Sequence, residues 1–165
     1  MHRQDTPPRS SPRVRGLLLP GLLAGLLARG LWQHPGDEVL RHAMPWFESP
    51  VDFLGSTEGM ERESRSLDLC AQGERNSCFF RVTQGSATGE TALPWLDAEL
   101  AVIIAVNRVP GDDIAIALDY RGDPANPAVV ASDVWTEPPG FIWRSVAPSF
   151  PAFAAMLGIG EPPIS

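Results

Sequence analysis

The sequence predicts a single α+β domain in which a largely antiparallel sheet is flanked by N-terminal and C-terminal helices. Four strand-like runs follow one another in the second half of the chain, and the turns between them are too short to hold crossover helices. Helical patterns lie before and after these runs. A length of 165 residues with 44% hydrophobic content fits one domain with one hydrophobic core.

The first helix is expected within the apolar run from Leu17 to Ala28. Pro20 suits its first turn and Gly30 its end, and its leucines recur at the spacing of one helix face. The leucines of this stripe are Leu19, Leu22, Leu23, Leu26 and Leu27. A basic flank before a short apolar run is also the outline of a secretory signal peptide, so that interpretation stays open as the alternative. The run is too short for a transmembrane helix.

Two more helices are expected before the strands. A short one lies near residues 38–42, in an apolar connector that several prolines interrupt. The other is predicted by the stretch STEGMERESRSLDLC, where Glu58 and Arg62, and likewise Glu61 and Arg65, have the spacing of helical ion pairs. The charges on this helix indicate a face in contact with solvent.

Five runs have the length and composition of strands. The run ELAVIIAV, Glu99–Val106, is apolar after its first residue and suits a central strand. The other four runs are Ser77–Val82, Ile114–Tyr120, Val129–Trp135 and Phe141–Val146.

A helix is expected to close the domain in the stretch PSFPAFAAMLG. Ser149 suits the N-cap, because its hydroxyl can accept a hydrogen bond from a backbone amide of the first turn. Phe150, Phe153 and Leu157 share one helix face, and Gly158 suits the position that ends the helix.

The stretch VPGDDIAIALDYR raises the question of an acidic centre. Pro110 and Gly111 suit a type II turn, after which residues 114–120 alternate between the two faces of a strand. Asp113 and Asp119 share one face but stand about 20 Å apart. Two carboxylates that act on one bond need a separation of roughly 5 to 10 Å. The acids therefore predict a turn and a strand edge, not a catalytic pair.

Composition limits the partners and cofactors that can be expected. Residues 1–16 carry four Arg and one Asp, whereas residues 17–165 carry nine Arg against 19 acidic residues, a net charge of −10. An acidic body argues against nucleic-acid binding and permits a basic protein partner. The three histidines are scattered, so neither a metal nor another cofactor is expected. Cys70 and Cys78 are expected to be thiols, although a disulfide between them is geometrically possible.

Trp135 and Trp143 flank a TEPPG turn between the last two strands. The simpler interpretation is that their rings cover the end of the sheet. The alternative makes one of them an anchor for a protein partner, because tryptophan is enriched among the residues that dominate binding energy.

The carboxyl-terminal half resembles the SUKH superfamily, which includes the Smi/Knr-type domains. Members typically show a Gly-Asp before an apolar strand that ends near an Asp, a Val-rich strand with a terminal aromatic, and a last helix that opens with Ser-Phe and has a second Phe three residues on. The matching residues here are Gly111, Asp112, Asp119, Val129, Val130, Trp135, Ser149, Phe150 and Phe153. The stretches LPWLD and AVIIAV resemble the bacterial subgroup, and the resemblance covers residues 93–159 best.

The resemblance implies a cytoplasmic α+β domain, over residues 17–159, that binds another protein and is not an enzyme. Residues 1–16 would be a disordered basic tail and residues 160–165 a C-terminal tail. Many bacterial relatives are taken to be immunity proteins that neutralise a toxin, often a nuclease, and fungal relatives are scaffolds. Two alternatives stay open: a regulatory scaffold without a toxin partner, and a small hydrolase that uses the aspartates. The oligomeric state is not indicated.

On the leading interpretation, the partner would meet an acidic face of the sheet and the adjoining loops. The acids and the aromatic anchor expected there are Asp112, Asp113, Asp119, Asp123, Asp133 and Trp135. Complementary charge would speed the encounter with a basic toxin.

Overall fold

The computed structural model describes residues 12–46, 50–72, 82–83, 96–108, 114–133 and 142–159. Its helices are α1 (Gly21–Ala28), α2 (Asp37–Ala43), α3 (Thr57–Gln72), the 3₁₀ helix η2 (Ala98–Leu100) and α4 (Phe150–Leu157). Its strands are β1 (Arg13–Val14), β2 (Leu17–Leu18), β3 (Val51–Phe53), β4 (Val82–Thr83), β5 (Leu96–Asp97), β6 (Ala101–Asn107), β7 (Ala115–Asp119), β8 (Ala128–Asp133) and β9 (Ile142–Ala147).

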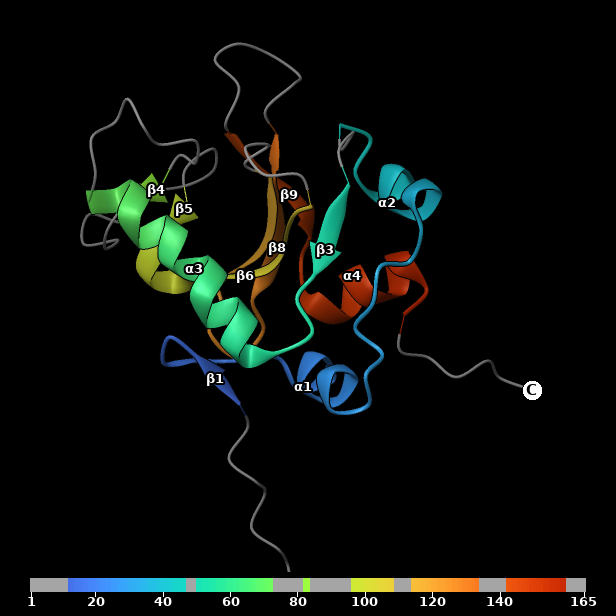
Figure 1. Cartoon of the computed structure of the whole chain (residues 1–165), viewed down its shortest axis with the longest axis horizontal. Helices are drawn as coiled ribbons and strands as arrows, with labels where there is room; N and C mark the ends of the chain where they lie inside the picture. The colour runs from blue at the N-terminus through green and yellow to red at the C-terminus, as the bar shows by residue number, and fades with distance from the viewer. Residues whose placement is uncertain are drawn as a thin grey trace, which may run out of the picture.

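The main sheet has five strands in the order β3-β6-β7-β8-β9, and all its neighbours are antiparallel. Strands β6 to β9 are therefore neighbours both along the chain and in space. Two small sheets accompany it, an antiparallel β1-β2 pair and a parallel β4-β5 pair. Figure 1 shows α3 and α4 on opposite sides of the main sheet. The predicted fold class, α+β with a largely antiparallel sheet between N-terminal and C-terminal helices, is confirmed.

The alternation predicted for residues 114–120 is present in β7, but it separates two buried faces. Ile116 and Leu118 belong to the larger hydrophobic core together with residues of α1 and α4. Ala115 and Ala117 point the other way and belong to a second core that also contains Trp143. All of these side chains are at most 1% exposed. Packing therefore covers both sides of β7 between Ala115 and Leu118.

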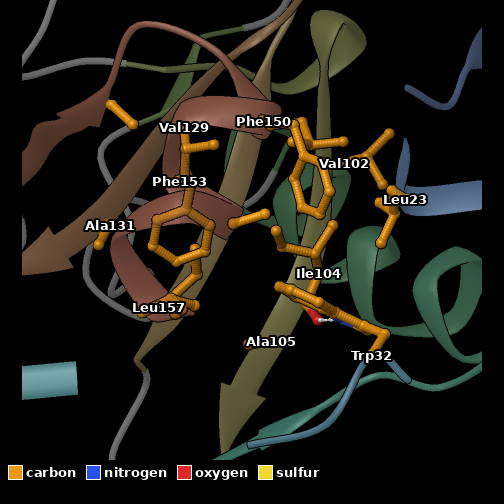
Figure 2. Packing of buried hydrophobic residues seen from close by; sticks show 14 of the residues in the cluster. Leu23, Trp32, Val102, Ile104, Ala105, Val129, Ala131, Phe150, Phe153 and Leu157 are labelled. Carbon is orange, nitrogen blue, oxygen red and sulfur yellow. Dashed lines mark hydrogen bonds between the residues drawn. The ribbon is translucent and has the colours of Figure 1, made fainter. Parts of the chain in front are cut away.

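Helix α1 confirms the predicted core helix, and Pro20 lies at its start as expected. Leu19, Leu23 and Leu26 are at most 1% exposed, and Leu22 and Leu27 are partly buried against the same core. The helix begins after Pro20, since Leu17–Leu18 forms a strand instead. Figure 2 shows the Leu23 side chain near Val102 and Phe150, so residues of this helix lie in the centre of the domain.

A hairpin precedes α1, where a disordered tail up to residue 16 was expected. Arg13–Val14 pairs with Leu17–Leu18, and the Val14 side chain is fully buried. Arg15, in the left-handed turn of this hairpin, donates its backbone N–H to Glu61 Oε1 (2.6 Å) and its guanidinium to the Ser64 carbonyl (3.2 Å). The boundary expected between residues 16 and 17 thus falls inside a hairpin that is bonded to α3.

These contacts also change the predicted charge pairing on α3. Glu61 accepts a hydrogen bond from the hairpin, and Arg62 forms an ion pair with Glu63 at 3.6 Å. Neither contact is one of the i,i+4 pairs expected from the sequence. The hydrogen bond from Arg15 to Glu61 joins the hairpin to α3 across 46 residues of sequence. Local residue spacing cannot predict a contact of this range.

Helix α4 matches its prediction in every local detail. The Ser149 hydroxyl accepts a hydrogen bond from the Ala152 amide at 3.2 Å, and Gly158 adopts the left-handed conformation that ends the helix. Phe150 and Phe153 are fully buried and pack near Trp32, with ring centroids 5.4 and 6.4 Å from it (Figure 2). The indole N–H of Trp32 donates to the Ile104 carbonyl at 3.3 Å, which fixes this packing against β6.

The connector between α2 and α3 holds a strand that the sequence analysis missed. Val51–Phe53 pairs with β6 and forms one edge of the sheet, directly after Pro50. The helix near residues 38–42 is present as α2, and the strand predicted at Glu99–Val106 is β6. It begins at Ala101 because Asp97 caps the 3₁₀ turn before it, accepting a hydrogen bond from Glu99 N at 2.9 Å. Of the run Ser77–Val82, only Val82 lies within the described residues.

Tyr120 is expected to make the stability of the folded state depend on pH in the alkaline range. It is 1% exposed, its hydroxyl donates to the Leu18 carbonyl at 2.8 Å, and burial raises the pKa of this phenol above its ordinary value. The native state therefore keeps a proton that the unfolded state releases. We expect the free energy of unfolding to fall above roughly pH 10, by up to about 1.4 kcal/mol per pH unit.

Denaturant titrations between about pH 9 and pH 11 measure this slope. The chain contains no lysine and one tyrosine, so few other side chains titrate in this range. Tyr120→Phe is the control: it should lose about 1 kcal/mol at neutral pH, with the hydrogen bond, and show a flatter alkaline slope. Equal slopes in the two proteins would contradict the assignment to Tyr120.

Candidate protein-interaction surface

Asp119, the first predicted site residue within the described part of the chain, is held by Arg121, two residues further on. The arginine donates Nε to Oδ1 and Nη2 to Oδ2, both at 3.0 Å, and its backbone N–H also donates to Oδ1 at 3.1 Å. Both side chains are 13% exposed. This bidentate geometry is the strongest form of a carboxylate–guanidinium pair. Asp119 therefore fixes the turn after β7 and presents little of its carboxylate to a partner.

Asp123 lies in the exposed connection between β7 and β8. Its carboxylate accepts the Ala125 amide at 2.9 Å, and its carbonyl accepts the Asn126 amide at 3.0 Å. This is the hydrogen-bonding pattern by which Asp stabilises a turn. The side chain is exposed, so it shapes the loop and adds negative charge to the surface.

The predicted acids lie at two ends of the sheet. Asp119 pairs with Ala128 at one end of β7-β8, whereas Asp133 ends β8 and pairs with Ile142 at the other. The length of β8 separates the two ends by roughly 17 Å. Asp112, Asp113 and Trp135 lie outside the described residues. Asp119 and Asp123 thus share one end of the sheet, and the structure does not bring Asp133 to them.

An unexpected aromatic–cationic pair lies on the face of the sheet that carries α2 and α4. The Trp46 indole N–H donates to the Ser132 carbonyl at 3.2 Å, and the Arg144 guanidinium carbon lies 5.8 Å from the centroid of the Trp46 ring. That separation is within the range of a cation–π interaction. Both side chains are half-buried. We call Trp46 and Arg144 the Trp–Arg pair.

Three separate segments position the Trp–Arg pair. Trp46 follows α2 and is held by its hydrogen bond to β8, and Arg144 projects from the edge strand β9. Alternation along β9 buries Trp143 on the opposite face, in the second core. Trp143 therefore covers the sheet, as the simpler interpretation of the TEPPG tryptophans expected.

Sequence reasoning missed this pair for a physical reason. Trp46 lies in a proline-interrupted connector and Arg144 lies 98 positions later, so no local spacing links them. The strand alternation that buries Trp143 could have indicated that Arg144 faces the other side of the sheet. Which aromatic side chain meets it there depends on the tertiary fold.

Among the described residues, no group of three or more His, Cys, Asp or Glu side chains could hold a metal ion. Within the same part of the chain, no helix has both the length and the apolar character needed to cross a membrane. Cys70 lies in α3, and Cys78 lies outside the described residues, so the question of their pairing stays open.

Comparisons of the chain with protein-family models, with curated proteins and with solved structures found no match. The resemblance to the SUKH superfamily therefore stays a prediction that rests on the motifs of residues 93–159.

Proposed function

We propose that this protein is a cytoplasmic protein-binding domain of the SUKH type and that it does not catalyse a reaction. The observation that carries the proposal is the half-exposed Trp–Arg pair, held in place by the hydrogen bond from Trp46 to Ser132. Tryptophan and arginine are the side chains most enriched among residues that dominate protein–protein binding energy. A tryptophan whose ring is already fixed loses little conformational entropy on binding.

The positions of the family motifs support the same proposal. Ser149 caps α4, Phe150 and Phe153 fill the larger core, and Asp119 fixes the turn after β7. These residues have structural roles. Proteins that share a fold are expected to share the residues that shape it, so such residues can carry the resemblance. The partner would then be recognised by side chains outside the motifs, such as the Trp–Arg pair.

The charge of the domain supports a basic partner. Residues 17–165 have a net charge of −10, and exposed carboxylates include Glu38, Glu99 and Asp123. Such a field attracts a basic protein and accelerates the encounter. The negative charge therefore supports an immunity role, in which the domain neutralises a basic toxin such as a nuclease.

The hydrolase alternative has less support. A general base or nucleophile must be free to accept a proton or attack a substrate, and its pKa must suit that task. Asp119 instead accepts three hydrogen bonds from Arg121 and is 13% exposed. Asp123 stands in an exposed turn, where its carboxylate accepts a hydrogen bond from the Ala125 amide.

The test is co-expression with the product of an adjacent toxin-like gene, followed by measurement of toxicity and of affinity. We expect the two proteins to co-purify and the toxicity to be suppressed. Trp46→Ala and Arg144→Ser should each weaken binding at least about tenfold, the effect of losing a binding hot spot. Thermal unfolding of each variant checks that the domain still folds.

Glu58→Ala and Arg65→Ala are matched controls, because both side chains are exposed on α3, on the other side of the sheet. They should leave the affinity within about twofold of the wild type. If the two proteins do not associate, or if toxicity is unchanged, the immunity role is wrong. A genome without a toxin-like neighbouring gene would favour the regulatory scaffold.

A further inference from the structure

His34 lies at the rim of the larger core, just before α2. Its ring centroid is 5.6 Å from that of Phe53, and its side chain is 21% exposed. Nδ1 accepts the backbone N–H of Gly36 at 2.9 Å, whereas Nε2 is buried and makes no hydrogen bond within the described part of the chain. Oδ1 of Asp37 is 3.5 Å from Nε2. The two ring nitrogens therefore face different neighbours.

The contact with Gly36 depends on the charge of the imidazole. A ring nitrogen that accepts a hydrogen bond carries no proton, so the neutral ring holds its proton on Nε2, toward Asp37. In a charged ring both nitrogens are donors. Nδ1–H would then point at a second donor, the Gly36 N–H, and their hydrogen bond could not form. Protonation instead strengthens the attraction between Nε2 and the Asp37 carboxylate.

The hydrogen bond to His34 holds the start of α2. Gly36 has φ 113° and ψ 147°, a conformation open essentially only to glycine, and glycine has the most backbone freedom to lose on folding. The Gly36 carbonyl accepts the Leu40 amide at 3.1 Å, and the Leu40 carbonyl accepts the Met44 amide at 2.7 Å. The position of Gly36 thus sets the first turn of a helix that has only seven residues.

The charges near the ring come from α2 and β3. The titratable side chains of α2 are Asp37, Glu38, Arg41 and His42. Of these, the structure places Asp37 at ion-pair distance from His34. On β3, Phe53 faces the ring, whereas Asp52 lies on the opposite side of the strand and forms an ion pair with Arg108 at 2.8 Å. Helix α4, which contacts α2, has no titratable side chain.

We propose that His34 is a pH-sensitive switch for the first turn of α2. Histidine is the side chain whose charge ordinarily changes between about pH 5 and pH 8. Above this range the neutral ring accepts the Gly36 amide and holds the turn. Below it, the charged ring exchanges Gly36 for Asp37 and releases the turn. Because Asp37 and Glu38 lie on this turn and are exposed, acid changes the placement of two surface carboxylates.

Amide hydrogen exchange of the full chain, measured by NMR at about pH 8 and about pH 5, tests the proposal. Rates are compared with those of an unfolded chain, which removes the intrinsic pH dependence of exchange. The Gly36 and Leu40 amides should lose about fivefold in protection at the lower pH, the effect of one hydrogen bond. The Met44 amide, at the other end of α2, should keep its protection. Imidazole nitrogen NMR at the higher pH should place the proton of His34 on Nε2.

Two substitutions separate the charge of His34 from its hydrogen bond. His34→Ala removes the acceptor, so both amides should have the low, acid-like protection at both pH values. His34→Asn keeps an acceptor two residues before Gly36, the position of an Asx-turn, but cannot gain a proton, so protection should not depend on pH. His42→Asn is the matched control: His42 is exposed on the same helix, and the variant should keep the wild-type response.

Several results would overturn the proposal. One is a wild-type chain whose Gly36 and Leu40 amides stay protected in acid, and another is a neutral ring with its proton on Nδ1. A pH dependence that persists in His34→Asn, or disappears in His42→Asn, also contradicts it. Equal losses at Gly36, Leu40 and Met44 would show acid unfolding of the domain in place of a switch. None of these measurements uses a partner, so the switch and the proposed protein-binding function succeed or fail separately.

Discussion

Phe153→Ala is expected to lower the free energy of unfolding by about 3–5 kcal/mol, among the largest effects of any single substitution in this chain. The Phe153 side chain is fully buried in the larger core, with its ring centroid 6.4 Å from that of Trp32. Alanine removes most of this apolar area and leaves a cavity, because α4 is fixed at both ends by the Ser149 cap and by Gly158. The surrounding residues therefore have little freedom to collapse into the space.

Chemical denaturation of both proteins measures this loss, with the slope of the transition as a check that folding stays two-state. Met156→Ala is the matched control on the same helix, since Met156 is 43% exposed, and it should change stability by less than about 0.5 kcal/mol. If the two substitutions cost the same, α4 does not pack as described. A large loss would also show that Phe153, one of the residues on which the SUKH resemblance rests, acts through the core.

Local chemistry explains which elements the sequence could predict. Helix α4 is specified by its own residues, from the Ser149 cap through Phe150, Phe153 and Leu157 to the left-handed Gly158, and it occurs where it was expected. Strand β7 follows from alternation in the same way. In such segments the short-range signals for start, buried face and end agree with one another.

The elements that could not be predicted depend on residues far apart in the sequence. The hairpin of β1 and β2 is short, and Arg15 is bonded to Glu61 and Ser64 of α3. Strand β3 has three residues and is defined by its pairing with β6. Neither has enough residues to show a periodicity, so only the tertiary contacts reveal them.

The candidate site was harder to predict than the fold for the same reason. Charge and turn chemistry identified Asp119 and Asp123, which prove to stabilise a turn and a loop. Alternation along β7 suggested an exposed polar face, but small residues such as Ala115 and Ala117 allow the other side of the sheet to be covered as well. Predicting the Trp–Arg pair would have required knowledge of how the segment after α2 packs against β8 and β9. Surface recognition is set by such tertiary arrangements more than by local pattern.

Deletion of residues 1–28 is expected to prevent folding, whereas deletion of residues 1–11 should leave a stable domain. The longer deletion removes Leu19, Leu23 and Leu26, which are at most 1% exposed in the larger core. Each buried leucine contributes about 2–5 kcal/mol, and a domain of this size has a total stability of only about 5–15 kcal/mol. The deletion also removes the Leu18 carbonyl to which the Tyr120 hydroxyl donates.

Circular dichroism and thermal unfolding of the two truncated chains measure the outcome, and Leu23→Ala in the full chain provides a graded comparison, with an expected loss of about 2–5 kcal/mol. The shorter deletion begins at Pro12, whose carbonyl accepts the Leu19 amide at 3.0 Å, so it keeps the hairpin and α1 complete. The result decides between the two interpretations of the leucine-rich segment. A cleaved signal peptide must be dispensable for the mature fold, whereas a core helix cannot be. Cooperative unfolding of the chain that begins at Arg29 would therefore contradict the core role of α1 and restore the signal-peptide interpretation.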